Sequence, residues 1–141
     1  MAEAGELIAG LNEDLAAEYQ AVVMYRTYAA LVSGPWRRDL RAFFEGEIPD
    51  ELGHAALLAD KIVSLGGTPT VDVPPIPIPR DAREMLENAL QAEVDTIERY
   101  TRRIRQADEC GEISIRVELE NMISDESRHR DEIRRMLMDW R

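Results

Sequence analysis

One pattern of glutamate and histidine residues occurs twice in this sequence, and the second copy follows the first at a constant spacing of 75 residues. Each copy consists of one glutamate followed later by a Glu-x-x-His pair. The residues are Glu18, Glu51 and His54 in the first copy and Glu93, Glu126 and His129 in the second. The chain contains no other histidine. Four carboxylates and two imidazoles in matched halves are a ligand set that suits a pair of metal ions.

Apolar residues recur every three or four positions in four long segments, which is the period of an amphipathic helix. The pattern predicts helices at about residues 3–32, 36–65, 81–110 and 112–140. Asp81 and Glu84 form a capping-box pattern at the start of the third helix. We therefore expect an all-α protein, with a single domain over residues 1–141.

The second and third predicted helices are joined by residues 68–80, which hold five prolines among thirteen residues. Proline-rich sequence is extended, at roughly 3.1 Å per residue, so this segment spans on the order of 40 Å. A thirty-residue helix is about 45 Å long. The segment is therefore long enough to return along the bundle, and we expect the third helix to run parallel to the second.

Each of the four repeated glutamates falls near the middle of its own predicted helix. The middles of the helices lie at one level in a bundle, so the carboxylates should meet in one layer. The i, i+3 spacing also places the glutamate and histidine of each pair on one helix face. A single glutamate in an acidic chain is normally solvated, and burying four of them costs many kcal/mol unless cations compensate. The pattern thus predicts a dinuclear metal centre, for which iron or manganese is suitable and zinc can substitute.

At these residues the chain resembles the ferritin-like diiron-carboxylate proteins, and it is most similar to the bacterioferritins. The similarity extends from Leu11 to Trp140. It implies a ferritin-like four-helix bundle with a long crossover and with two iron ions per subunit. The implied roles are bridging of the two ions by Glu51 and Glu126, and binding of one ion each by Glu18, Glu93, His54 and His129.

The resemblance also implies a function, which is oxidation of Fe(II) to Fe(III) by O2 or H2O2. Iron storage or detoxification would follow if the subunits assemble into a cage. Tyr25 lies about two helical turns beyond Glu18, and bacterioferritins have a tyrosine at this position near the metals. We therefore include Tyr25 among the expected catalytic residues.

Two departures from the bacterioferritin pattern concern haem and assembly. Bacterioferritins place a haem-ligating methionine directly after the bridging glutamate of the second helix, and this chain has Leu52 there. Leucine offers no lone pair to iron, so no haem is expected. The sequence ends at Arg141, twelve residues after His129, without the short fifth helix of ferritin subunits. We expect a homo-oligomer, with a dimer, a dodecamer and a larger cage as the alternatives.

Other functions remain open for the same ligand set. A rubrerythrin-like diiron peroxidase is the first alternative, although that family has a further glutamate one turn beyond its third-helix ligand, where this chain has Thr96 and Ile97. A dimanganese catalase or another dimetal oxidase is a second alternative. A bundle that serves only as a non-catalytic metal-binding or interaction scaffold is a third.

Several residues beside the six ligands have weaker signals. Tyr100 repeats Tyr25 at the same spacing, and we interpret it as a core aromatic residue whose hydroxyl finds a hydrogen-bond partner. Glu47 lies one turn before Glu51, and we interpret it as a solvated side chain rather than an iron relay. Asp50 and Asp125 precede the Glu-x-x-His glutamates. If the second and fourth helices cross antiparallel, Asp50 should pair with His129, and Asp125 with His54.

The composition excludes some classes of function. The net charge of −11 is unfavourable for nucleic-acid binding and favourable for attracting cations. No apolar run approaches the roughly 18 residues of a membrane span. The first residues show no basic stretch followed by an apolar run, and the single Cys110 fits a reducing compartment. We therefore expect a cytoplasmic protein without nucleic-acid or membrane partners.

Overall fold

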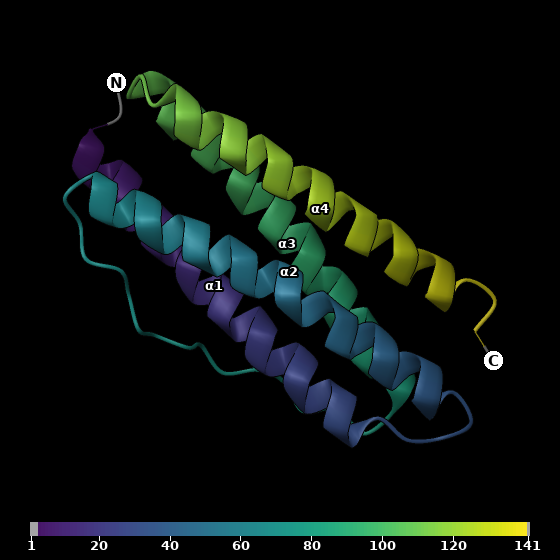
Figure 1. Cartoon of the computed structure of the whole chain (residues 1–141). Helices are drawn as coiled ribbons and strands as arrows, with labels where there is room; N and C mark the ends of the chain where they lie inside the picture. Colours follow the sequence, from purple (N-terminus) through teal and green to yellow (C-terminus); the bar gives the residue numbers. More distant parts are fainter. Residues whose placement is uncertain (1–2, 141) are drawn as a thin grey trace.

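The computed structural model describes residues 3–140, and these residues form a bundle of four helices (Figure 1). The helices are α1 (Ala4–Leu31), α2 (Arg37–Ser64), α3 (Ala82–Glu109) and α4 (Ile113–Leu137). The expected all-α bundle is therefore confirmed. Residues 1, 2 and 141 of the expected domain lie outside the described residues.

The last helix is shorter than its apolar pattern indicates. α4 ends at Leu137 rather than near Trp140, and the amide of Met138 donates to the carbonyl of Arg134 as the final turn closes. Asp139 then has a positive φ of 57°, which is incompatible with a continuing right-handed helix.

The other helix ends lie within about one residue of the positions that capping and glycine signals indicate. The Asp81 carboxylate accepts a hydrogen bond of 2.8 Å from the amide of Glu84, as the capping pattern requires.

The proline-rich segment between α2 and α3 passes along the outside of α1, so that α3 runs in the same direction as α2 (Figure 1). Three polar side chains of α1 bind carbonyl groups of this crossover. Asn12 and Gln20 donate at 3.1 and 2.9 Å, and the hydroxyl of Tyr28 donates at 2.8 Å. These residues recur every eight positions, so α1 holds the crossover at three levels along its length. The predicted long crossover is thus observed, and α1 positions it.

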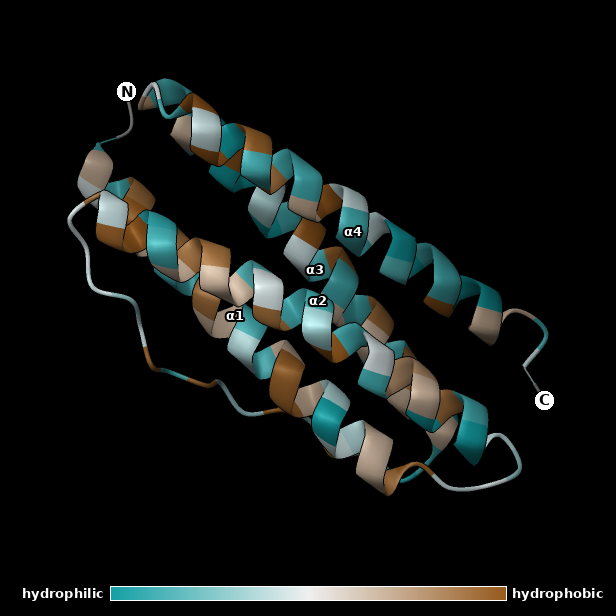
Figure 2. Ribbon diagram, viewed as in Figure 1, coloured by the Kyte–Doolittle hydropathy of each residue, from teal (hydrophilic) through white to brown (hydrophobic). Residues whose placement is uncertain are grey.

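The core consists of two apolar clusters, one toward each end of the bundle. The helices alternate between hydrophobic and hydrophilic residues along their length (Figure 2). The cluster near the α1–α2 connection includes Met24, Tyr28, Phe44, Leu86 and Ile133. The cluster near the other end includes Leu11, Leu58, Ile62, Leu119 and Met122. Burial of each large apolar side chain contributes about 1.5–3 kcal/mol, so the clusters supply the main stabilisation on both sides of the middle layer.

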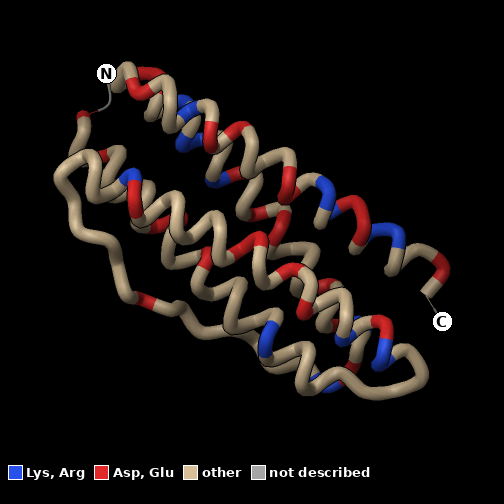
Figure 3. Tube along the Cα trace, in the orientation of Figure 1, with Lys and Arg blue, Asp and Glu red and all other residues tan. Residues whose placement is uncertain are grey.

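Acidic residues occur along all four helices and also in the middle of the bundle (Figure 3). Within residues 3–140, no helix combines the length and the apolar character that crossing a membrane requires.

A buried ion pair between α1 and α3 adds a charged contact to the core near the middle layer. Asp14 is 1% exposed and Arg103 is 5% exposed. The guanidinium donates from Nε at 2.8 Å and from Nη2 at 3.2 Å to the two carboxylate oxygens. Gly10 leaves the space for this guanidinium, because a side chain at position 10 would overlap it. Burial raises the pKa of Asp14, although the hydrogen bonds from Arg103 oppose the shift.

Replacing Asp14 by Ala leaves Arg103 buried without its partner. We expect this variant to lose about 3–5 kcal/mol of the free energy of unfolding, measured by urea denaturation. The matched double variant Asp14→Leu/Arg103→Met removes both charges and should recover most of the loss. Equal stability of the single and double variants would contradict a buried, mutually dependent pair.

Candidate metal centre

The structure brings all six residues of the repeated pattern together in the middle layer of the bundle. Each helix supplies at least one of them. Every one of the six residues is 6% exposed or less. The layer contains Glu18 from α1, Glu51 and His54 from α2, Glu93 from α3, and Glu126 and His129 from α4.

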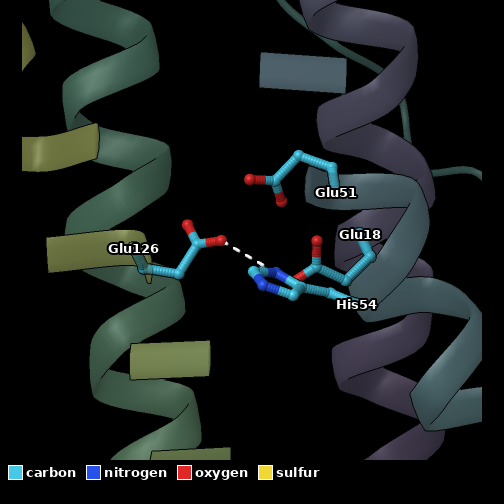
Figure 4. Close-up of side chains that lie close together, drawn as sticks. All are labelled: Glu18, Glu51, His54 and Glu126. Atoms are coloured by element: carbon cyan, nitrogen blue, oxygen red, sulfur yellow. Dashed lines mark ion pairs between the residues drawn. The ribbon is translucent and has the colours of Figure 1, made fainter. Parts of the chain in front are cut away.

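One group of converging ligand atoms comprises Glu18, Glu51, His54 and Glu126, whose ligand atoms all lie within 4.8 Å of one another. Figure 4 shows these four side chains pointing toward one another. His54 Nδ1 lies 3.0 Å from Glu126 Oε1 and 3.7 Å from Glu18 Oε1. The spacing allows one ion to contact an imidazole nitrogen and several carboxylate oxygens.

A second group comprises Glu47, Glu51, Glu93 and His129, again within 4.8 Å. His129 Nδ1 lies 2.8 Å from Glu47 Oε2, 3.3 Å from Glu51 Oε1 and 3.7 Å from Glu93 Oε1. Glu51 belongs to both groups. A carboxylate that faces both ligand groups is placed to bridge two ions.

Each histidine ring is held by an aspartate of the opposite helix. His54 Nε2 lies 2.9 Å from Asp125 Oδ2, and His129 Nε2 lies 3.0 Å from Asp50 Oδ2. The crossed pairing predicted from the sequence is therefore confirmed. With Nε2 donating to the aspartate, the lone pair of Nδ1 points at the carboxylates, and this is the usual orientation of a metal-binding imidazole.

Two tyrosines connect α1 and α3 at the centre. The hydroxyl of Tyr25 donates to Glu93 Oε1 at 2.5 Å, and the hydroxyl of Tyr100 donates to Glu18 Oε1. Tyr25 is thus next to the centre as expected, although its partner is the glutamate of the opposite helix. Tyr100 is a buried core aromatic, as expected, and the partner of its hydroxyl is the ligand carboxylate of Glu18.

The interpretation of Glu47 as a solvated side chain was wrong. Glu47 is only 9% exposed, and its carboxylate faces the Nδ1 atom of His129. Two signals in the sequence could have indicated this. Glu47 lies one turn before Glu51 on the same helix face. The residue at the corresponding position of the second copy is Met122, and an apolar residue there indicates that the position is buried.

Buried polar atoms that lack a hydrogen-bond partner indicate whether the layer is suited to hold metal ions. In the described part of the chain, seven of its buried N and O atoms have no hydrogen-bond partner. They are Oε2 of Glu18, Glu47 and Glu93, Oε1 of Glu51 and Glu126, and Nδ1 of His54 and His129. An unsatisfied buried polar atom costs about 1–3 kcal/mol. Because the seven lone pairs converge in two groups, the residues fit a pair of divalent cations.

The carboxylates and histidines perturb each other's protonation. Burial raises the pKa of Glu51 well above its ordinary value, and the charges of Glu18 and Glu126 add to the shift. Burial alone would lower the pKa of the histidines, but the surrounding carboxylates raise it to about 10 for His54 and about 9 for His129. Metal ions would displace these imidazole protons, so binding should release protons and strengthen as the pH rises.

A cavity of about 220 Å³ leads from the α1–α3 face toward the centre. The crossover forms part of its wall through Ile76 and Pro77, and Thr96 and Arg99 line it on α3. The cavity also contacts Glu51, Glu93 and Glu126. Small molecules therefore have space to approach the carboxylates from this side.

A four-helix bundle with a buried layer of glutamates and histidines defines a class of carboxylate proteins with a candidate dinuclear centre. The comparisons with known proteins agree with this class. The family model described as "Ferritin-like domain" matches residues 8–141. The chain belongs to the ferritin-like family.

Relatives and solved structures give the same result. The chain is 29% identical to a bacterioferritin of Streptomyces coelicolor, over 89% of this chain and 76% of the relative. It is 30% identical to a bacterioferritin of Mycobacterium tuberculosis, over 86% and 77%. A ferritin-like diiron-carboxylate protein of Bacillus anthracis superposes with a TM-score of 0.94 at 51% identity, covering 97% of this chain and 99% of that protein. A Dps protein of Bacillus brevis has a TM-score of 0.90 at 20% identity, covering 97% and 99%, and shares the fold. The resemblance found in the sequence is confirmed.

Asp50→Asn and Asp125→Asn should each weaken metal binding, because the amide is a poorer acceptor for the imidazole N–H. We expect on the order of tenfold lower affinity for Zn(II), measured by calorimetry, with unchanged helix content. Asp60→Asn, at an exposed position of α2, serves as the control. Wild-type affinity in both Asp50→Asn and Asp125→Asn would show that the aspartates do not orient the metal ligands.

Proposed function

We propose that this protein is a ferroxidase, which oxidises Fe(II) to Fe(III) at a dinuclear centre within one subunit. The observation that carries the proposal is the pair of ligand groups that share Glu51, each with a histidine Nδ1 facing unsatisfied carboxylate oxygens. The bacterioferritin relatives support iron as the metal.

In this proposal Glu51 and Glu126 bridge the two iron positions. Glu18 and His54 bind one ion, and Glu93 and His129 bind the other. The hydroxyls of Tyr25 and Tyr100 hold the carboxylates of Glu93 and Glu18. Asp50 and Asp125 hold the histidine rings. Because the donors are fixed before the metal arrives, two ions can be held side by side at little cost in reorganisation.

In the proposed reaction the Fe(II) ions are the reductant, and O2 or H2O2 is the oxidant. Two Fe(II) ions each lose one electron, and the two electrons with two protons reduce O2 to H2O2, or H2O2 to two water molecules. The cavity on the α1–α3 face offers the oxidant a route to Glu51, Glu93 and Glu126. The buried carboxylates favour the more highly charged Fe(III), since they stabilise positive charge in a site with little solvent.

Assembly and location belong to the same proposal. The acidic chain and its bacterioferritin relatives support a cytoplasmic homo-oligomer, and storage of ferric mineral would require a closed cage. A dimer would instead favour redox turnover without storage. A peroxidase of the rubrerythrin type is less well supported, because Thr96 lines the cavity where that family has a further glutamate.

We expect the purified protein to bind two Fe(II) ions per subunit under anaerobic conditions and to oxidise them rapidly when O2 or H2O2 is added. Glu51→Ala or Glu126→Ala removes a bridge and should abolish rapid oxidation, followed by the absorbance of Fe(III). Glu132→Ala, at an exposed position of α4, is the control and should oxidise iron as the wild type does.

Wild-type oxidation rates in Glu51→Ala or Glu126→Ala would overturn the assignment of the centre. Turnover of H2O2 that needs an external reductant, with no accumulation of Fe(III), would favour a peroxidase instead.

A further inference from the structure

The two halves of the centre are related by the 75-residue spacing, but they differ at several positions near the ligands, and two of these differences place a charged side chain beside one ligand group. Glu47 in the first half corresponds to Met122 in the second. Gly53 in the first half corresponds to Arg128 in the second. Both differences change the charge around one histidine and not around the other.

Glu47 adds a carboxylate to the group around His129. Glu47 is 9% exposed, and its Oε2 lies 2.8 Å from Nδ1 of His129, so a single cation could contact both atoms. Glu47 also lies with Glu51 and Glu93 in one set of converging ligand atoms, so it is a candidate ligand rather than a neighbour.

Met122 stands at the equivalent position beside the other group. It is 3% exposed and packs in the apolar cluster that includes Leu58 and Leu119. A thioether is a soft and weak donor for divalent cations that prefer oxygen and imidazole ligands. With Glu51 and Glu126 shared between the two positions, as proposed above, the His54 position adds one carboxylate of its own, Glu18, whereas the His129 position adds two, Glu47 and Glu93.

The second difference, Gly53 against Arg128, affects the aspartates that orient the histidines. The guanidinium of Arg128 contacts Asp125, the partner of His54. Position 53, which corresponds to Arg128, is a glycine and brings no charge toward Asp50, the partner of His129. An aspartate that is already paired with a cation polarises its imidazole less, so His54 should be the weaker ligand of the two.

We propose that the two metal positions are unequal, and that the position formed by Glu47, Glu93 and His129 binds a divalent cation more tightly than the position formed by Glu18 and His54. The inference rests on the proposed dinuclear centre and adds an order of filling to it. Glu47 is the residue that determines the preference, and the pairing of Asp125 with Arg128 reinforces it. The tighter position is then occupied first, and the weaker position exchanges its ion more readily.

The order of filling can be measured with Zn(II), which undergoes no redox reaction. Crystals of the metal-free protein are soaked with about one Zn(II) per subunit, and the occupancy of each position is refined from anomalous scattering at the zinc edge. We expect the His129 position to be occupied roughly tenfold more than the His54 position, which is the effect expected for the loss of one supporting carboxylate.

Two variants test the cause. Glu47→Gln keeps the shape of the side chain and removes its charge, so the occupancies should become nearly equal. Met122→Glu supplies the missing carboxylate to the other half and should raise the occupancy at His54. Equal occupancy in the wild type, preference for the His54 position, or an unchanged preference in Glu47→Gln would overturn the inference while leaving the dinuclear centre in place. Absence of zinc from both positions would overturn the proposed function as well.

Discussion

The burial of five carboxylates in one layer of a helical bundle is the constraint on which the rest of this structure depends. Glu18, Glu47, Glu51, Glu93 and Glu126 are buried, and a hydrophobic interior offers nothing to compensate their charge. The fold meets this constraint in two ways. An apolar cluster on each side of the layer stabilises the helices, and the hydroxyls of Tyr25 and Tyr100 donate hydrogen bonds to Glu93 and Glu18. Neither is sufficient alone, because seven polar atoms still lack a partner and converge in two groups.

The fold and the six predicted ligands could be predicted from the sequence because both depend on regular spacing. The apolar period defines four helices, and the repeated Glu and Glu-x-x-His pattern places six ligands at the helix middles. The proline-rich segment has the length needed for a parallel return, and the structure shows it along α1 (Figure 1). Regular spacing did not predict that Glu47 faces His129 or that Tyr100 donates to Glu18. A single glutamate in an acidic chain is normally solvated, and only the packing of α2 against α4 shows that this one is buried.

The two sides of the layer differ chemically. On the α1–α3 side, a cavity bounded by the crossover reaches the carboxylates, and its lining includes Thr96 and Arg99. On the α2–α4 side, Asp50 and Asp125 bind the histidine rings, and Glu47 faces His129. The described residues thus give small molecules space to approach the carboxylates on the α1–α3 side, whereas the α2–α4 side orients the histidine ligands.

The most direct test of the central claim is the free energy of unfolding of the protein with and without metal. Urea denaturation would be followed by circular dichroism in the presence of a chelator and, separately, with excess Mn(II) under anaerobic conditions. If cations compensate the buried carboxylates, Mn(II) should stabilise the folded state by about 3 kcal/mol or more, as expected for a ligand at 100 times its dissociation constant or above. An unfolding midpoint that is the same with chelator and with Mn(II) would contradict the claim that the layer is a metal centre.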